Sequence, residues 1–392
     1  MAHHRSSGPP RLAIALITGL VLILAVVVGG LGRAAGPSGP PGGSGRADLS
    51  AASTGTPAVS PSRGTARATP TSGASSASPT PTASPPPVAV ASGPFAGDLL
   101  IADRQNGRIL IVDPAGRIKW RFPVAGSLPA GRGFAADDAF LAPDGKTIVA
   151  NEEGHEVIDR IDIATRRIVW QYGRYNVAGR GVGELHTPDD AYPLANGDVV
   201  VADIRNCRVI EIDLAKRITR QWGRTGVCID NAPRTYGDPN GDTPLADGGL
   251  LITEIRGSRV VRLDARGRVV FDIHVPTAYP SDAHLDAKGD ILVVDYSNPG
   301  AIIRLDRHGH VLWRYAPRSG RGRLDHPSLA IDLTTGLVAV NDDFRHRVLV
   351  IDPKTNRIVW QYGHTDRHSR ANGFLFTPDG IDEIPPAVAA TL

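Results

Sequence analysis

The sequence lacks the motifs on which several common enzyme classes depend. It contains only 2 cysteines in 392 residues and no Cys-x-x-Cys-His run, which excludes covalently attached haem. No glycine-rich phosphate loop, no Gly-x-Ser-x-Gly turn and no clear Ser-His-Asp set occur. Neither nucleotide-dependent chemistry nor serine-hydrolase chemistry is therefore indicated.

Aromatic residues are also scarce, at 5% of the chain, and neither sign of charge dominates. The 43 basic and 40 acidic residues give a formal net charge of +3. A nucleic-acid-binding protein would concentrate its basic residues in a patch or stripe. We therefore expect no nucleic acid among the partners.

One long uncharged run is present, "LAIALITGLVLILAVVVGGLG" at residues 12–32. At about 1.5 Å per residue such a helix would span roughly 30 Å, the thickness of a bilayer core. Arg5 and Arg11 precede the run and Arg33 follows it. We predict a transmembrane signal anchor over residues 12–32, with residues 1–11 in the cytoplasm. The alternative is a cleaved signal peptide, whose apolar region is usually about 7–15 residues long.

Residues 33–94 consist almost entirely of Gly, Pro, Ser, Thr and Ala. They carry too few large apolar side chains to offset the entropy of ordering, so we predict a disordered linker. The protein is then a single-pass cell-membrane protein that holds its remaining residues, 95–392, on the extracytoplasmic side.

Residues 95–392 contain an internal repeat, seen in "GDLLIADRQNGRILIVDPAGRIKWRF" from Gly97 and "GDVVVADIRNCRVIEIDLAKRITRQWG" from Gly197. Each unit has three short apolar runs separated by turn residues, and a fourth short run precedes it, so each unit reads as four strands. A unit length of roughly 40–52 residues is typical of a propeller blade. Six units are present, and the final segment "FTPDGIDEIP" (Phe376–Pro385) matches the start of a unit. We predict an all-β, monomeric six-bladed β-propeller with four-stranded blades, closed by this segment as the inner strand of the first blade.

The pattern "VAD…N…RV" resembles the NHL-repeat family, and the "W.YG" endings of the units resemble quinoprotein-like (PQQ-like) propellers of membrane-anchored bacterial proteins. The blade texture is also similar to that of arylsulfotransferases, and lyases occur on six-bladed rings. The resemblance implies the architecture, but propellers host unrelated functions. The chain is shorter than a full quinoprotein dehydrogenase, so we expect no PQQ.

Tryptophan recurs at one register of the repeat, and a phenylalanine takes its place in the fourth unit. This spacing predicts that the six rings lie on the outermost strands and pack blade against blade: Trp120, Trp170, Trp222, Phe271, Trp313 and Trp360.

An acid or amide ends the second strand of every unit, at Asp103, Asn151, Asp203, Glu254, Asp295 and Asp342. A basic residue opens the third strand in four units, at Arg108, Arg208, Arg259 and Arg347. Because the pattern repeats, we interpret these residues as scaffold. As surface ion pairs they would contribute about 0–1 kcal/mol each.

The two residues that open each inner strand differ from blade to blade. These opening pairs are Asp137-Asp138, Asp189-Asp190, Asn240-Gly241, Ser281-Asp282, Ser328-Leu329 and Asp379-Gly380. Inner strands line the central channel, so we expect Asp138, Asp190 and Asp282 to converge, with the other acids nearby. Clustered carboxylates must bind a cation, bind basic groups, or have raised pKa values. Calcium at Asp138, Asp190 and Asp282 is the cofactor hypothesis, and turn capping by each Asp is the alternative.

Long loops carrying Arg and His lead into the inner strands and share one rim with the turns between second and third strands. The candidate ligand-binding residues on that rim are Asp138, Asp189, Asp190, Asp282, Asp379, His186 and Arg205. Cys207 and Cys228 lie there too and, outside the cytoplasm, are expected to form a disulfide.

Three functions remain open from the sequence. The first is a binding module for an unidentified extracytoplasmic ligand or protein partner. The second is an arylsulfotransferase-like or lyase-type enzyme, with His186 as acid/base and Arg205 holding an anionic oxygen. The third is an envelope spacer without a ligand.

Overall fold

The computed structural model describes residues 93–392. The predicted cytoplasmic segment, the signal anchor at residues 12–32 and nearly all of the linker lie outside the described residues. Within residues 93–392, no helix is long and apolar enough to cross a membrane.

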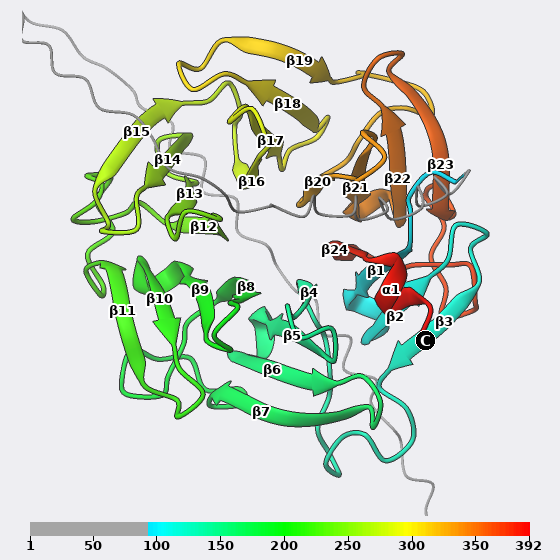
Figure 1. The fold of residues 1–392 in the computed structure, drawn as a ribbon, viewed down its shortest axis with the longest axis horizontal. Helices are drawn as coiled ribbons and strands as arrows, with labels where there is room; N and C mark the ends of the chain where they lie inside the picture. Colours follow the sequence, from blue (N-terminus) through cyan, green and yellow to red (C-terminus); the bar gives the residue numbers. More distant parts are fainter. Residues whose placement is uncertain (1–92) are drawn as a thin grey trace, which may run out of the picture. The chain divides into compact units, whose positions relative to one another are not determined.

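Six four-stranded antiparallel sheets are arranged as blades around a central axis (Figure 1). Blades 1 to 3, written from the innermost strand outward, are β24 (Pro378–Ile384), β1 (Asp98–Asp103), β2 (Arg108–Val112), β3 (Ile118–Phe122); β4 (Ala139–Leu141), β5 (Thr147–Glu152), β6 (Val157–Asp162), β7 (Arg167–Gly173); and β8 (Pro188–Pro193), β9 (Val199–Asp203), β10 (Arg208–Ile212), β11 (Ile218–Gly223).

The other three blades follow the same order. They are β12 (Pro239–Pro244), β13 (Leu250–Glu254), β14 (Arg259–Leu263), β15 (Val269–His274); β16 (Pro280–Leu285), β17 (Ile291–Asp295), β18 (Ala301–Leu305), β19 (Val311–Tyr315); and β20 (Ala330–Asp332), β21 (Val338–Asp342), β22 (Arg347–Asp352), β23 (Arg357–Gly363). In four blades a 3-10 turn joins the second strand to the third: η1 (Arg104–Asn106), η2 (Glu153–His155), η3 (Ile204–Asn206) and η4 (Asp343–Arg345).

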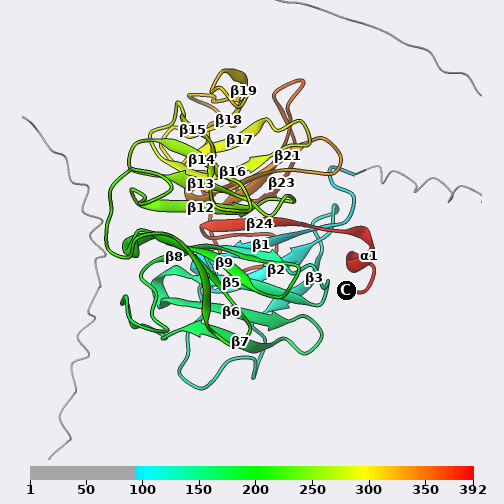
Figure 2. The ribbon, with the colours of Figure 1, turned by 60° about the vertical axis from the view of Figure 1, so that its left-hand side comes forward.

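The ring closes through β24, which pairs antiparallel with β1 from Asp98↔Ile384 to Asp103↔Pro378. The prediction that the C-terminal segment supplies the inner strand of blade 1 is therefore confirmed. The short helix α1 (Pro386–Ala389) follows β24 and lies beside β3 (Figures 1 and 2). Lys119 of β3 donates a hydrogen bond to the Ala389 carbonyl, which ties this end to blade 1.

The blades pack face to face, so their middle strands are apolar without alternation. In β1 and β9, for example, every residue is buried, as expected for strands covered on both faces. The predicted tryptophan packing is confirmed, because the indoles lie on outermost strands and reach the next blade. Four of them donate a hydrogen bond there: Trp120 to Ile163, Trp170 to Leu214, Trp313 to Asn356 and Trp360 to Pro114.

The acid that ends each second strand accepts a hydrogen bond from a backbone N–H of the loop that enters the inner strand of the same blade. The acceptor–donor pairs are Asp103–Phe376, Glu152–Ala135, Asp203–His186, Glu254–Gly237, Asp295–Ala278 and Asp342–Asp325, at 2.7–2.9 Å. We call this repeated contact the loop clamp. It fixes all six inner strands at one face of the propeller. This face carries these loops and the turns between second and third strands, and we call it the loop-bearing face.

The arginine that opens the third strand completes the loop clamp in four blades. Arg108, Arg208, Arg259 and Arg347 pair with the clamp acids at 2.6, 2.8, 3.9 and 2.7 Å. The prediction that these are surface pairs is wrong, because the blades and loops cover them. Asp342 and Arg347 are both fully buried, and burial raises the pKa of Asp342 to about 6 although Arg347 counteracts this.

In blade 2 the clamp acid is Glu152, and the assignment of this place to Asn151 was wrong by one residue. Glu152 lies opposite Val157, the register that Asp103 and Arg108 occupy in blade 1. Arg132 from the preceding loop pairs with Glu152 at 2.8 Å, which compensates for the missing third-strand arginine. Asn151 points toward blade 3 instead, and its amide donates to the Pro188 carbonyl at 3.2 Å.

Replacing Arg347 by methionine should lower the free energy of unfolding by about 3–5 kcal/mol, because it leaves the Asp342 carboxylate buried and unpaired. The loss should shrink as the pH falls and Asp342 takes up a proton. Chemical denaturation of purified protein measures both effects. The matched control is Arg117→Met: that side chain is 82% exposed in its pair with Asp113, so its loss should cost about 0–1 kcal/mol. Equal losses for the two variants would contradict the assignment.

Candidate functional site

Four inner strands are irregular where their opening pairs lie. In β8, Asp189 lies opposite Ala202 and the regular register resumes only at Tyr192↔Val200. The register also shifts in β12, β16 and β24. Bulges commonly re-aim side chains beside functional sites. Asp190 itself has a φ of +47°, the left-handed region that few residues other than Gly, Asn and Asp adopt.

The opening pairs surround a cavity of about 200 Å³ where the channel meets the loop-bearing face. We call it the channel-mouth cavity. Its lining is polar apart from two tyrosine rings: Arg104, Asp137, Asp138, Glu153, Asp189, Asp190, Asn240, Tyr279, Ser281, Tyr296, Ser328 and Asp379. The structure thus brings together Asp138, Asp189, Asp190 and Asp379, four of the candidate residues.

Arg104 neutralises one side of the cavity. From η1 its guanidinium contacts Asp137, Glu153 and Asp379, the last at 2.8 Å. Burial raises the pKa of Asp379, but Arg104, Asp137 and Ser328 outweigh it and hold that pKa below its usual value. For Asp137, burial prevails over Arg104 and the pKa lies well above its usual value.

Asp138 and Asp189 lie next to each other in the cavity, with carboxylate oxygens of Asp137, Asp138 and Asp189 within 4.8 Å of one another. Burial raises the pKa of Asp189 well above its usual value, and the neighbouring charge of Asp138 adds to the effect. Burial, followed by repulsion from Asp379, raises the pKa of Asp138 to about 7. The Asn240 amide also donates to Asp189, and Tyr279 donates to the Asn240 amide oxygen at 2.9 Å.

Asp190 has no such support. The residue is only 3% exposed and lines the cavity, yet no hydrogen-bond donor or cation within residues 93–392 contacts its carboxylate. Burial and the charges of Asp282 and Asp138 raise its pKa well above the usual value. A buried acceptor that lacks a donor is stabilised by a ligand that supplies both a positive charge and a hydrogen-bond donor.

Asp282 lies behind the cavity wall rather than on it. Its carboxylate is 2.7 Å from Nε2 of His284 and accepts a hydrogen bond from Thr243 at 3.2 Å. The metal trio expected from the sequence therefore does not share one face of the cavity. The carboxylates whose oxygens lie within 4.8 Å of one another belong to Asp137, Asp138 and Asp189.

His186 and Arg205 lie on the loop-bearing face but do not line the cavity. The His186 N–H belongs to the loop clamp of blade 3. Arg205 is exposed in η3, and its N–H donates to the His186 carbonyl at 3.1 Å. The structure brings the two residues beside each other, but neither is among the residues that line the cavity.

Sequence reasoning missed four lining residues: Arg104, Glu153, Tyr279 and Tyr296. Three of them occupy one place in the repeat, directly after the acid that ends the second strand. The same place in η4 holds Asp343, whose side chain accepts from Ser328 at 3.1 Å. A search for the residue after each clamp acid would have found them, and the misplacement of the blade 2 acid at Asn151 concealed Glu153.

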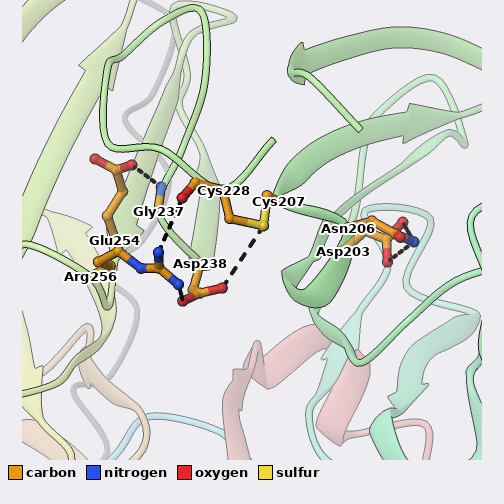
Figure 3. Close-up of a disulfide and its surroundings, with 8 residues drawn as sticks. All are labelled: Asp203, Asn206, Cys207, Cys228, Gly237, Asp238, Glu254 and Arg256. Carbon is orange, nitrogen blue, oxygen red and sulfur yellow. Dashed lines mark hydrogen bonds and ion pairs between the residues drawn. A yellow bond between two sulfur atoms is a disulfide. The ribbon is translucent and has the colours of Figure 1, made fainter. Parts of the chain in front are cut away.

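The disulfide expected between Cys207 and Cys228 is present, with Cα atoms 5.2 Å apart. It joins the turn of blade 3 to the following loop (Figure 3). That loop is also held by Arg256, which contacts the Cys228 carbonyl and Asp238. Asp238 lies 3.9 Å from the Cys207 sulfur, but a metal would need thiolates, so we interpret this group as structural.

Comparisons with known proteins agree with the architecture. A PQQ-repeat family model, described as outer membrane protein assembly factor BamB, matches residues 216–375, which confirms the PQQ-like resemblance. No curated protein matches the sequence.

Solved structures show likeness of fold at low identity. A protein of unknown function from Bacteroides caccae is 16% identical over 73% of this chain and 97% of its own, with a TM-score of 0.52. A chain of a nidogen/laminin complex is 15% identical over 72% and 97%, with a TM-score of 0.51. Virginiamycin B lyase from Staphylococcus aureus is 16% identical over 60% and 72%, with a TM-score of 0.42. The last likeness is too low to carry an argument about activity.

Replacing Asp138 by asparagine should stabilise the folded protein, and the gain should grow with pH. The folded-state pKa is about 7 against 3.8 for an unperturbed carboxyl, so ionisation of Asp138 costs stability increasingly from about pH 4 to pH 7 and constantly above. At roughly 1.4 kcal/mol for each unit of pKa, the gain reaches about 4 kcal/mol. Thermal melts across this pH range measure it.

Asp379→Asn is the contrasting variant, since the pKa of Asp379 is lowered. Its stability should be reduced at neutral pH, and the difference should diminish as the pH falls. A gain for Asp138→Asn that does not vary with pH would show that this carboxyl is not titrating as described.

Proposed function

We propose that the protein is a single-pass cell-membrane protein whose extracytoplasmic propeller is a binding module, and that the channel-mouth cavity binds a positively charged ligand. The observation that carries the proposal is Asp190, a buried carboxylate without a partner among the described residues that faces a cavity lined by other acids. The membrane attachment through residues 12–32 and the expectation of an extracytoplasmic protein partner come from the sequence alone.

The charge distribution in the cavity supports a cationic ligand. Six acidic residues line it against one arginine, Arg104. Arg104 reaches three of those acids, so Asp138, Asp189 and Asp190 remain without a positive partner among residues 93–392. A cation there would lower their pKa values and remove the cost of crowding them. Calcium is one candidate occupant, since all the donors are oxygen atoms.

An enzyme of the arylsulfotransferase-like or lyase type is the second candidate function. The observation that favours it is the pKa of Asp138, which burial raises to about 7, a value that suits a general base at neutral pH. In this alternative Asp138 takes the acid–base role that the sequence suggested for His186.

The test is a thermal melt of the full-length protein with CaCl2 or n-butylammonium chloride, against NaCl at equal ionic strength. A cation that binds only the folded state adds about 2.7 kcal/mol at a hundredfold excess over Kd, so we expect the melting temperature to rise by several degrees. The rise should vanish in Asp190→Asn, because asparagine tolerates a positive φ and keeps the shape of the site. No rise with either cation would refute the binding function.

A further inference from the structure

The wall of the channel-mouth cavity combines carboxylates with aromatic rings. Tyr279 and Tyr296 both line it, and their ring centroids lie 5.2 Å apart. Tyr296 also packs against His326, with centroids 4.8 Å apart. Aromatic faces attract organic cations and the carbon atoms bonded to them. A metal ion has no carbon atoms that could pack against these rings.

The carboxylates that line the cavity together with the tyrosines need hydrogen-bond donors as well as charge. Asp190 accepts no hydrogen bond to its side chain from any residue in the described part of the chain. Asp138 has the Asn151 amide as a neighbouring donor, but that amide donates to the Pro188 carbonyl. A group with several N–H donors and one positive charge would satisfy acceptors on two adjacent inner strands at once.

Arg104 demonstrates this mode of binding in the other half of the same cavity. Its guanidinium contacts Asp137 from blade 2, Asp379 from blade 1 and Glu153 from η2. One nitrogen cation thus already bridges carboxylates of different blades at the channel mouth. The second half offers Asp138, Asp189 and Asp190 without an internal cation of its own.

Calcium fits the same space less well. It takes about 6–8 oxygen ligands, but the Asn240 oxygen already accepts from Tyr279, and the Asn240 amide donates to Asp189. Asp137, one of the three acids whose oxygens lie within 4.8 Å of one another, is already paired with Arg104. The cavity, at about 200 Å³, is also several times the ~30 Å³ that one water molecule occupies.

We infer that the ligand of the channel-mouth cavity is a small organic molecule with a primary ammonium group, which donates to Asp190 and Asp138 while its carbon chain lies against Tyr279 and Tyr296. This inference rests on the proposed function and specifies the class of ligand. The ammonium nitrogen occupies the acidic half of the cavity that Arg104 leaves open.

The experiment is isothermal titration calorimetry of the full-length protein at neutral pH with n-butylammonium, tetramethylammonium and calcium chlorides at equal ionic strength. Tetramethylammonium carries the charge without a donor, and calcium carries more charge without carbon. We expect n-butylammonium to bind most tightly. Asp190→Asn should weaken it by about tenfold or more, and Tyr296→Leu, which keeps an apolar side chain without a π face, by about threefold.

Asp144→Asn is the matched control, since that acid is exposed in the turn between β4 and β5 at the opposite face, and it should leave binding unchanged. Equal binding of tetramethylammonium and n-butylammonium would overturn the inference, because donors would then be irrelevant. Calcium binding that depends on Asp190, without n-butylammonium binding, would overturn the inference and leave the proposed function standing. If neither cation binds, both fail.

Discussion

The hydrogen bond from a loop N–H to the acid at the end of the second strand governs the rest of this propeller. It occurs in all six blades, and each time it holds the loop just before that loop enters the inner strand. A shift of one residue in that loop would turn the opening pair away from the channel. The clamp carboxylates are mostly desolvated, and five of the six have an arginine beside them. The scaffold therefore places ion pairs in its interior.

The same constraint leaves the channel mouth with more acid than base. Each clamp fixes an inner strand, and each inner strand presents its opening pair to the axis whatever that pair is. An Asn-Gly or Ser-Leu pair can lie near the axis at little cost in free energy. In blades 2 and 3, however, both residues of the opening pair carry carboxyl groups. The molecule accommodates them in three ways: Arg104 pairs with Asp137 and Asp379, the Asn240 amide donates to Asp189, and His284 pairs with Asp282. Asp190 receives none of these.

The repeat made the architecture predictable, since blade number, ring closure, tryptophan packing and the disulfide follow from spacing and from alignment of one unit with the next. The convergence of the opening acids was predictable for the same reason. The distribution of contacts among them was not. Asp282 points toward His284 rather than into the cavity, and Arg104 reaches the axis from its turn. Both facts depend on side-chain direction, which the spacing of residues in the sequence does not determine. Tyr296 was missed because the place after each clamp acid holds a different residue type from blade to blade, and Tyr279 because it belongs to no repeated pattern.

Ring closure by β24 has a consequence for the order in which the site is made. A chain synthesised from its N-terminus delivers Arg104 early, whereas Asp379 arrives on the last strand, 275 residues later. Until β24 docks beside β1, the Arg104 guanidinium lacks that carboxylate and the channel has only five of its six walls. The channel-mouth cavity is therefore complete only in the closed ring, and a chain truncated before β24 would lack Asp379 and this wall even if its other five blades were folded.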